Sequence, residues 1–136
     1  MRNVRLANVP EITEQAMEND NLKRRTKQFA LRVIKLVESL PQDQVARVLG
    51  KQLLRSGTSV GANYRAACRS KSAADFIFKM GIVEEEADES GYWMELLQDS
   101  GRIKATKVSA LMQEAGELTA IAVSSINTAR KTPRRR

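Results

Sequence analysis

The sequence predicts an all-α protein built from four helices. Its 136 residues include only three prolines and seven glycines, and Ala, Leu, Glu, Lys and Arg, which favour helices, are abundant. Aromatic residues make up only 4% of the chain, which argues against a sheet. Apolar residues also recur with helical spacing along four segments. A chain of this length is expected to form one domain with a modest core.

The first helix is expected at about residues 21–40. At about 100° per residue, apolar side chains fall on one side of it and basic side chains on the other. The apolar set is Leu22, Thr26, Phe29, Val33, Leu36, Val37 and Leu40, and the basic set is Lys23, Arg24, Lys27, Arg32 and Lys35. Pro41 ends this helix and suits the first position of the next. Residues 1–18 are predicted to form a flexible N-terminal arm or a short extra helix.

The second helix contains RSGTSVGANYRAACRSKS, residues 55–72, which suggests a glycine-rich phosphate loop. Such a loop needs a preceding strand and a Gly-Lys-Ser/Thr ending, and neither is present. The helical phase instead continues through an unbroken stripe of Val45, Leu49, Leu53, Ser56, Val60, Asn63 and Ala67. Because a glycine inside a helix costs about 1 kcal/mol, Gly57 and Gly61 imply that another backbone lies close by.

The opposite face of this helix carries five basic residues within about 80° of one another on a helical wheel. They are Arg47, Lys51, Arg55, Arg65 and Arg69. This basic stripe is either a solvated helix face or a surface that follows nucleic-acid phosphates, and the sequence leaves both interpretations open.

Asn63 lies on the apolar stripe, where an amide without a hydrogen-bond partner costs about 1–3 kcal/mol. Glu84 borders the apolar stripe of the third helix and is the candidate partner. We interpret Asn63 and Glu84 as a structural pair that fixes the register of two helices, rather than as a catalytic pair.

The third helix is expected from Ser72, which forms a capping box with Asp75, to about Asp99. It has two apolar stripes on nearly opposite sides, and a single bundle can bury only one. The stripe expected in the core is Phe76, Met80, Val83, Ala87, Ser90, Gly91 and Met94. The second stripe and two neighbouring glutamates predict a subunit interface. That interface would contain Phe78, Ile82, Glu85, Glu89, Trp93 and Leu96.

The fourth helix follows a short connection, SGRIKAT, at residues 100–106. Its apolar stripe runs to about Arg130 through Val108, Leu111, Met112, Ala115, Leu118, Thr119, Ala122, Ile126 and Ala129. The four-helix bundle is therefore predicted to span residues 19–131. Residues 132–136 are expected to be a basic, disordered tail that is free to contact phosphates.

Charge is unevenly distributed along the chain, which carries a net charge of +7. Residues 1–71 contain 14 Lys/Arg against 6 Asp/Glu, residues 72–105 contain 3 against 8, and residues 106–136 contain 6 against 2. Either the basic surface meets a polyanion, or basic and acidic segments meet across a subunit boundary.

Several classes of protein are disfavoured by composition. The single cysteine, Cys68, excludes an intrachain disulfide, and with no histidine in the chain no common zinc motif is possible. No apolar run approaches the roughly 18 residues of a membrane span. We expect a soluble, cytoplasmic protein without cofactor or metal. A metal-dependent hydrolase built on Glu85, Asp88 and Glu89 is a weak alternative, because di-iron bundles use a Glu-x-x-His motif.

Residues 53–97, LLRSGTSVGANYRAACRSKSAADFIFKMGIVEEEADESGYWMELL, follow LPQDQVARVLGKQ and combine several motifs. SVGAN precedes a Ser-rich link, an F-x-x-K helix and EEADE-x-x-x-W-x-x-L. This combination resembles the four-helix-bundle proteins similar to the 23S rRNA intervening-sequence protein. That family is related to the accessory variability proteins of diversity-generating retroelements. The resemblance extends over roughly residues 20–130.

The resemblance implies an antiparallel, up-down four-helix bundle that assembles as a ring-like homo-oligomer, expected to be a homopentamer. It implies no known catalytic activity. It also implies contact with RNA for some members, and with nucleic acid and a reverse transcriptase for the retroelement relatives. Asn63 and residues 84–89 match signature positions of the family and look structural.

The leading hypothesis is a non-enzymatic homo-oligomer that binds nucleic acid, with RNA favoured, through the basic stripe. The second is an adaptor that binds a protein such as a reverse transcriptase or polymerase, and whose charges mainly serve oligomer assembly. Base specificity should be low in the first case, because Tyr64 is the only aromatic residue near the basic segment.

Overall fold

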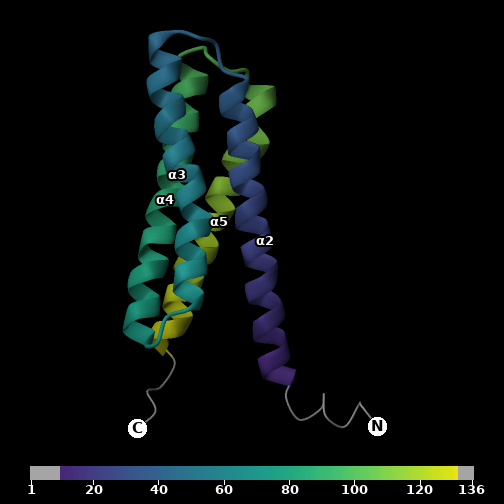
Figure 1. The fold of residues 1–136 in the computed structure, drawn as a ribbon, viewed down its shortest axis with the longest axis vertical. Helices are drawn as coiled ribbons and strands as arrows, with labels where there is room; N and C mark the ends of the chain where they lie inside the picture. The colour runs from purple at the N-terminus through teal and green to yellow at the C-terminus, as the bar shows by residue number, and fades with distance from the viewer. Residues whose placement is uncertain (1–9, 132–136) are drawn as a thin grey trace.

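The computed structural model describes residues 10–131 as four helices. They are α2 (Pro10–Glu38), α3 (Gln44–Cys68), α4 (Ala73–Asp99) and α5 (Ala105–Lys131), and the described residues contain no strand. Short turns join consecutive helices at alternating ends, so each helix runs opposite to the one before it (Figure 1). The prediction of an all-α chain with four helices is confirmed. No helix among the described residues combines the length and apolar character needed to cross a bilayer.

Helix α2 begins earlier than the sequence predicted. It starts at Pro10, so residues 10–18 continue α2 and form neither a flexible arm nor a separate short helix. Their sequence, PEITEQAME, is rich in helix-favouring Glu, Gln, Ala and Met, and Pro suits the first helical position. The Tyr64 hydroxyl of α3 also donates to Asn19 Oδ1 at 3.2 Å, which ties this early turn to the bundle. Residues 1–9 of the arm and the predicted tail at 132–136 lie outside the described residues.

The N-caps of α3 and α4 come from side chains. Asp43 caps α3 by accepting a hydrogen bond from Ala46 N at 2.8 Å, so α3 begins at Gln44 and not at Pro41 as predicted. Ser72 caps α4 by accepting from Asp75 N at 3.1 Å, as predicted. Both contacts satisfy a backbone N–H that has no partner within the helix.

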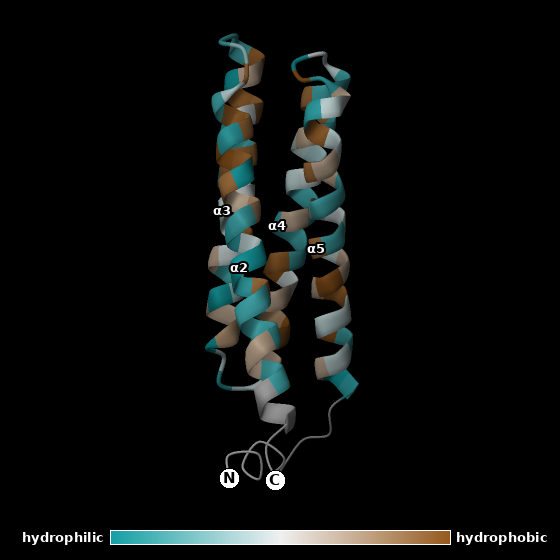
Figure 2. Cartoon of the chain, turned by 90° about the vertical axis from the view of Figure 1, so that its right-hand side faces the viewer, coloured by the Kyte–Doolittle hydropathy of each residue, from teal (hydrophilic) through white to brown (hydrophobic). Residues whose placement is uncertain are grey.

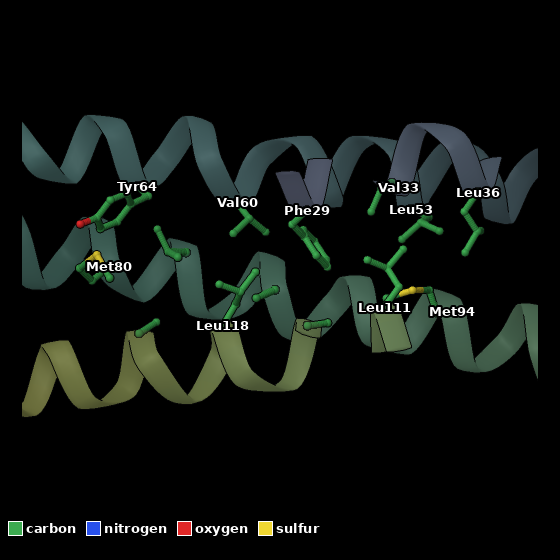
Figure 3. Close-up of a cluster of buried hydrophobic side chains, with 14 of the residues drawn as sticks. Phe29, Val33, Leu36, Leu53, Val60, Tyr64, Met80, Met94, Leu111 and Leu118 are labelled. Atoms are coloured by element: carbon green, nitrogen blue, oxygen red, sulfur yellow. The ribbon is translucent and has the colours of Figure 1, made fainter. Parts of the chain in front are cut away.

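The core lies along the axis of the bundle, where all four helices contribute buried side chains (Figure 3). Hydrophobic and hydrophilic residues alternate along each helix (Figure 2), as expected for amphipathic helices. The core positions predicted for α2, α4 and α5 are buried or half-buried. On α3 the predicted core positions Leu53, Ser56, Val60 and Ala67 are buried. The core is shifted around the helix from the rest of the predicted stripe, since Val45 is 42% exposed, whereas Ala46 and Tyr64 are buried.

Glycines explain this rotation, because they let α3 pack closely on α2. A Cβ added to Gly57 would lie 2.8 Å from Val33 Cγ2, and one added to Gly61 would lie 3.2 Å from Thr26 Oγ1. Gly50 faces Leu40 in the same way, at 3.0 Å from its Cδ1. The predicted close approach of a second backbone is confirmed at Gly61, where the backbone C of Thr26 lies 3.5 Å from the added Cβ, whereas the neighbour at Gly57 is the Val33 side chain. These contacts also fix which turns of α2 and α3 lie level with each other.

A buried pair of serines joins α3 to α4. The Oγ atoms of Ser56 and Ser90 are 2.9 Å apart, and both residues are fully buried. Ser90 donates to the Glu86 carbonyl at 2.8 Å, so its oxygen accepts the hydrogen that Ser56 donates, and the Leu53 carbonyl, 3.3 Å from Ser56 Oγ, is the alternative acceptor for Ser56. Because both groups are satisfied, this polar contact in the core fixes the register of the two helices at little cost.

Arg25 of α2 binds two glutamates of α5, and we call this contact the arginine fork. Helices α2 and α5 make fewer contacts with each other than any other neighbouring pair of helices. Arg25 donates from Nε and Nη2 to the two oxygens of Glu114, at 2.6 and 2.9 Å, and from Nη2 to Glu117 at 2.5 Å. The hydrogen bond with Glu114 is the main reason that the pKa of Arg25 is raised. Two-pronged geometry of this kind holds a side chain more firmly than a single ion pair does.

We expect Gly57→Ala to lower the free energy of unfolding by about 1–2 kcal/mol. The new methyl group would overlap the stiff, branched side chain of Val33, and overpacking outweighs the gain in helix propensity. Gly116→Ala on α5 is the matched control, because a Cβ there meets nothing within 4 Å. It should raise the free energy of unfolding by about 0.5–1 kcal/mol. Urea denaturation of both variants tests the contact, and equal effects would contradict it.

Stability should also depend on the ionisation of Asp43. Its hydrogen bond from the Ala46 amide, and after it the Arg102 guanidinium at 3.3 Å, lower the pKa of this carboxyl from 3.8. The stabilisation is therefore present above about pH 4 and is lost as pH falls through the lower native pKa. Asp43→Asn keeps the capping acceptor but cannot ionise. Urea midpoints measured from pH 7 to acid should fall less steeply for the variant, and identical profiles would contradict this role of Asp43.

Candidate nucleic-acid interface

The predicted basic stripe lies on the outer face of α3, and all five of its residues are exposed. They are not equivalent, however. Arg55 donates to both Glu86 oxygens, at 3.2 and 3.3 Å, and to Glu89 at 2.7 Å. These bonds, the one to Glu89 foremost, raise the pKa of Arg55. Its charge is thus neutralised by α4, and the stripe is divided into one pair, Arg47 with Lys51, and another, Arg65 with Arg69.

Helix α2 adds cations beside the second of these pairs. The contact of Gly61 with Thr26 places Lys23, Lys27 and Arg65 around the same turns of the two helices. Between them lies a groove of about 540 Å³, which we call the α2–α3 groove. It is lined by Lys23, Arg24, Thr26, Lys27, Ala30, Thr58, Gly61, Ala62 and Arg65. Four of these nine residues are cationic and none is acidic.

The four cations of the groove are available to a ligand. Within the described residues, neither Lys23, Arg24, Lys27 nor Arg65 forms an ion pair, and all four are exposed. Three small residues, Ala30, Gly61 and Ala62, also line the groove and leave room for a ligand close to the helix backbones. Four positive charges that converge on a concave surface without a counter-charge attract an anion, because such clefts concentrate the field.

Sequence reasoning did not find this groove because it belongs to two helices at once. The basic side of α2 was recognised, but a helical wheel shows one helix alone. The glycine pair was the signal that could have found it, since Gly57 and Gly61 had to face another backbone. Placing the basic helix of residues 21–40 against that side would have brought Lys23 and Lys27 to the same groove as Arg65.

The matches to known proteins agree with this architecture. The model of the 23S rRNA-intervening sequence protein family matches residues 18–124, which include parts of all four helices. The chain belongs to this family. The family predicted from the sequence is thus confirmed, whereas the search among curated proteins gave no match.

A solved structure supports the same fold for this 23S rRNA-intervening sequence family protein. It is a crystal structure of a protein with unknown function from the S23 ribosomal protein family of Bacteroides thetaiotaomicron. The two sequences are 37% identical, and the structures superpose with a TM-score of 0.74. The match covers 80% of this chain and 97% of the Bacteroides chain, so it includes nearly the whole of that protein.

The residues predicted to form a subunit interface on α4 differ in exposure in this family member. Phe78 is 68% exposed, and Glu85 is exposed as well. Ile82, Trp93 and Leu96 are half-buried, and Trp93 packs against the core. Glu89 is held within the chain, because it accepts hydrogen bonds from Trp93 Nε1 at 3.2 Å and from Arg55. An arginine from another chain would have to compete with Arg55 for it.

Two further sequence predictions concern polar residues of the bundle. The expected hydrogen bond between Asn63 and Glu84 is not formed: Asn63 Nδ2 donates to the Ser59 carbonyl on its own helix, at 2.8 Å. The rotation of α3 leaves Asn63 half-buried beside the core, where its own helix supplies a partner. The polar contact that joins α3 to α4 is instead Ser56 with Ser90. Among residues 10–131, Glu85, Asp88 and Glu89 are not part of any group arranged to hold a metal ion.

Proposed function

We propose that this protein is a non-enzymatic, homo-oligomeric nucleic-acid-binding protein whose α2–α3 groove holds the phosphate backbone. The observation that carries the proposal is the convergence of Lys23, Arg24, Lys27 and Arg65 on one groove that contains no acidic residue. Lysine and arginine side chains that neutralise phosphates release condensed counterions, which favours binding whatever the base sequence. Arg69, one turn beyond Arg65, extends the same surface.

Contacts of this kind carry little base specificity. Recognition of single-stranded bases depends on exposed aromatic side chains, and none lines the groove. Tyr64, next to Arg65 in sequence, is only 4% exposed and donates its hydroxyl to Asn19, and Phe29, next to Ala30, is fully buried. The protein would therefore recognise charge and backbone shape. The family description, which refers to an intervening sequence of 23S rRNA, favours RNA over DNA as the ligand.

Assembly into a ring, with five copies as the expected number, would present several grooves at once. Phosphate contacts that are weak in one copy then add up, because every groove after the first binds at a high effective concentration. In this proposal the cytoplasmic protein acts as an assembled basic surface, without a cofactor and without catalysis.

An interaction adaptor is the second candidate function. It is favoured by the pairing of Arg55 with Glu86 and Glu89, which shows that part of the basic stripe serves contacts between protein groups. In that case the exposed surface would bind a protein such as a reverse transcriptase or polymerase, and nucleic-acid binding would be absent or insensitive to salt.

The test is the anisotropy of labelled duplex RNA, duplex DNA and single strands, titrated with protein from low to physiological salt. In the groove variant, Lys23, Lys27 and Arg65 are all changed to Gln. We expect its affinity to fall for every sequence, and the slope of log K against log salt to shrink by about one for each cation that contacts a phosphate.

Two control variants distinguish the effect of the groove on binding from the effect of overall positive charge. Changing Lys104, Lys107 and Arg130 to Gln removes the same charge from the loop before α5 and from α5 itself, and it should leave the slope nearly unchanged. Arg55→Gln should also have little effect, because Glu86 and Glu89 already neutralise that side chain. If the groove variant and the first control lose affinity equally, or if the wild type does not bind, the proposal fails.

A further inference from the structure

The end of the bundle that holds the turn between α3 and α4 contains a pocket, which we call the end pocket. Its volume is about 320 Å³, and all four helices contribute to its wall. Tyr64, which lines it, lies near one end of the core, and Leu36 lies near the other (Figure 3). Spaces between the helices of a bundle are common sites for small ligands, in pockets of roughly 300–1,000 Å³. The side chains around the end pocket decide which ligand it suits.

Part of the wall of the end pocket is apolar. Leu22 of α2, Phe76 of α4 and Ile121 of α5 line it, and all three are half-buried and pack against the core. The core thus holds these side chains in place. Phe76 also supplies an aromatic surface, on which a flat ring of a ligand can stack.

The side of α2 that faces the core becomes polar at the end pocket. Thr26 and Phe29 on this side are buried, and Leu22, one turn earlier, is half-buried. One and two turns before Leu22, the helical period brings Asn19 and Gln15 to the pocket. Apolar residues at these two positions would extend the core. Because amides there reduce the apolar area that α2 buries, they favour a role in binding.

The amide of Asn19 is held in one orientation. Its Oδ1 atom accepts hydrogen bonds from the Tyr64 hydroxyl at 3.2 Å and from Gln15 Nε2 at 3.0 Å. These two bonds use both lone pairs of the oxygen. The Asn19 Nδ2 donors and the Gln15 Oε1 acceptor form no hydrogen bond with a described residue. The end pocket therefore offers a donor and an acceptor on two side chains that are bonded to each other.

The carboxylates around the end pocket disfavour an anionic ligand. Arg25 lines the pocket, but the two glutamates of the arginine fork offset its charge. Glu18 also lines the pocket, is exposed and forms no ion pair with a described residue. This excess of negative charge would repel a phosphate. The ligand of the end pocket is therefore expected to be uncharged or cationic.

We propose that the end pocket binds a nucleobase. A base is flat and uncharged, and it carries hydrogen-bond donors and acceptors along its edge, which asparagine and glutamine amides recognise. Its ring would pack on Phe76 and Ile121, and its edge would face Asn19 and Gln15. A cationic amine would match the charge of Glu18, whereas a base also uses the free amide donor and the apolar wall.

The base can come from a free nucleoside or from an unpaired nucleotide of a bound strand. The second source rests on the function proposed above. Lys23 and Lys27 of the α2–α3 groove and Leu22 and Arg25 of the end pocket lie on the same turns of α2. A strand whose phosphates lie in the groove would pass within one helix width, roughly 10 Å, of the pocket. The groove would bind any sequence, and the pocket would add a preference for strands with an unpaired base.

Nuclear magnetic resonance with adenosine, guanosine, cytidine and uridine tests the pocket without relying on nucleic-acid binding. At millimolar concentration, at least one of these uncharged nucleosides should shift the side-chain amide signals of Asn19. Ser125→Leu, a change at a half-buried residue that lines the pocket, should fill the space and abolish the shifts. Gln15→Ala removes the free acceptor and should raise the Kd about two- to tenfold, as expected for one hydrogen bond. Gln28→Ala, the matched control, changes an exposed glutamine of α2 outside the pocket and should leave the Kd unchanged.

Other results would overturn the proposal. They are a wild type that responds to none of the nucleosides, a folded Ser125→Leu variant that still binds, and equal losses in Gln15→Ala and Gln28→Ala. Circular dichroism checks that each variant folds, and the exposed position of Gln15 keeps the test decisive if Ser125→Leu does not. 1,5-Diaminopentane is the cationic probe, and shifts from it alone would show that the pocket takes an amine instead of a base. Replacing Lys23, Lys27 and Arg65 by Gln must leave nucleoside binding intact, because these residues do not line the end pocket.

The anisotropy of two labelled RNA duplexes that differ by one unpaired base identifies the source of the base. If the strand supplies it, the wild type binds the duplex with the unpaired base more tightly. Ser125→Leu then loses this preference but keeps the salt dependence of the groove. Equal affinity for the two duplexes, with nucleosides still bound, assigns the pocket to free nucleosides. If neither RNA binds, the proposed function fails, and the nucleoside titration still decides the proposal for the end pocket.

Discussion

The close approach of α2 and α3 is the constraint on which the rest of the structure depends. Glycine at positions 50, 57 and 61 lets the two helices meet with Leu40, Val33 and Thr26 in contact. That contact turns α3 so that Ala46 and Tyr64 face the core and Val45 does not. It also brings Lys23 and Lys27 of α2 to the same groove as Arg65 of α3. A bulkier residue at Gly57 would change the spacing of the two helices and of these cations.

Much of the fold could be predicted from the sequence, because helical period and caps are local properties. The Ser72 cap and the core positions of α2, α4 and α5 follow from residues within a few positions of one another. The rotation of α3 could not be predicted in this way, since its apolar stripe is broad enough to suit two orientations and the contact with α2 selects one. The helical residues 10–18 were missed because they carry few apolar residues, and the contact of Asn19 with Tyr64 is distant in sequence.

The charges of the candidate site could also be predicted only in part from the sequence. A helical wheel correctly placed five cations on the outside of α3, but it could not show that Glu86 and Glu89 neutralise Arg55. It also could not show that α2 supplies three of the four cations in the α2–α3 groove. The net charge of a segment therefore does not predict how much unpaired charge its surface carries. Residues of a neighbouring helix neutralise some of the charges and add others beside them.

The sparse attachment of α2 to α5 has a consequence for local dynamics. Helix α2 packs on α3 through contacts that extend from Asn19 to Leu40, but it contacts α5 much less, with Arg25 bound to Glu114 and Glu117. Partial opening that releases one helix exposes least apolar surface when that helix has the fewest neighbours. The amides of α2 should therefore exchange with solvent hydrogen sooner than those of α4, which packs fully against two helices. Because α2 forms one wall of the α2–α3 groove, a ligand held there would bind only the closed form and would slow that exchange.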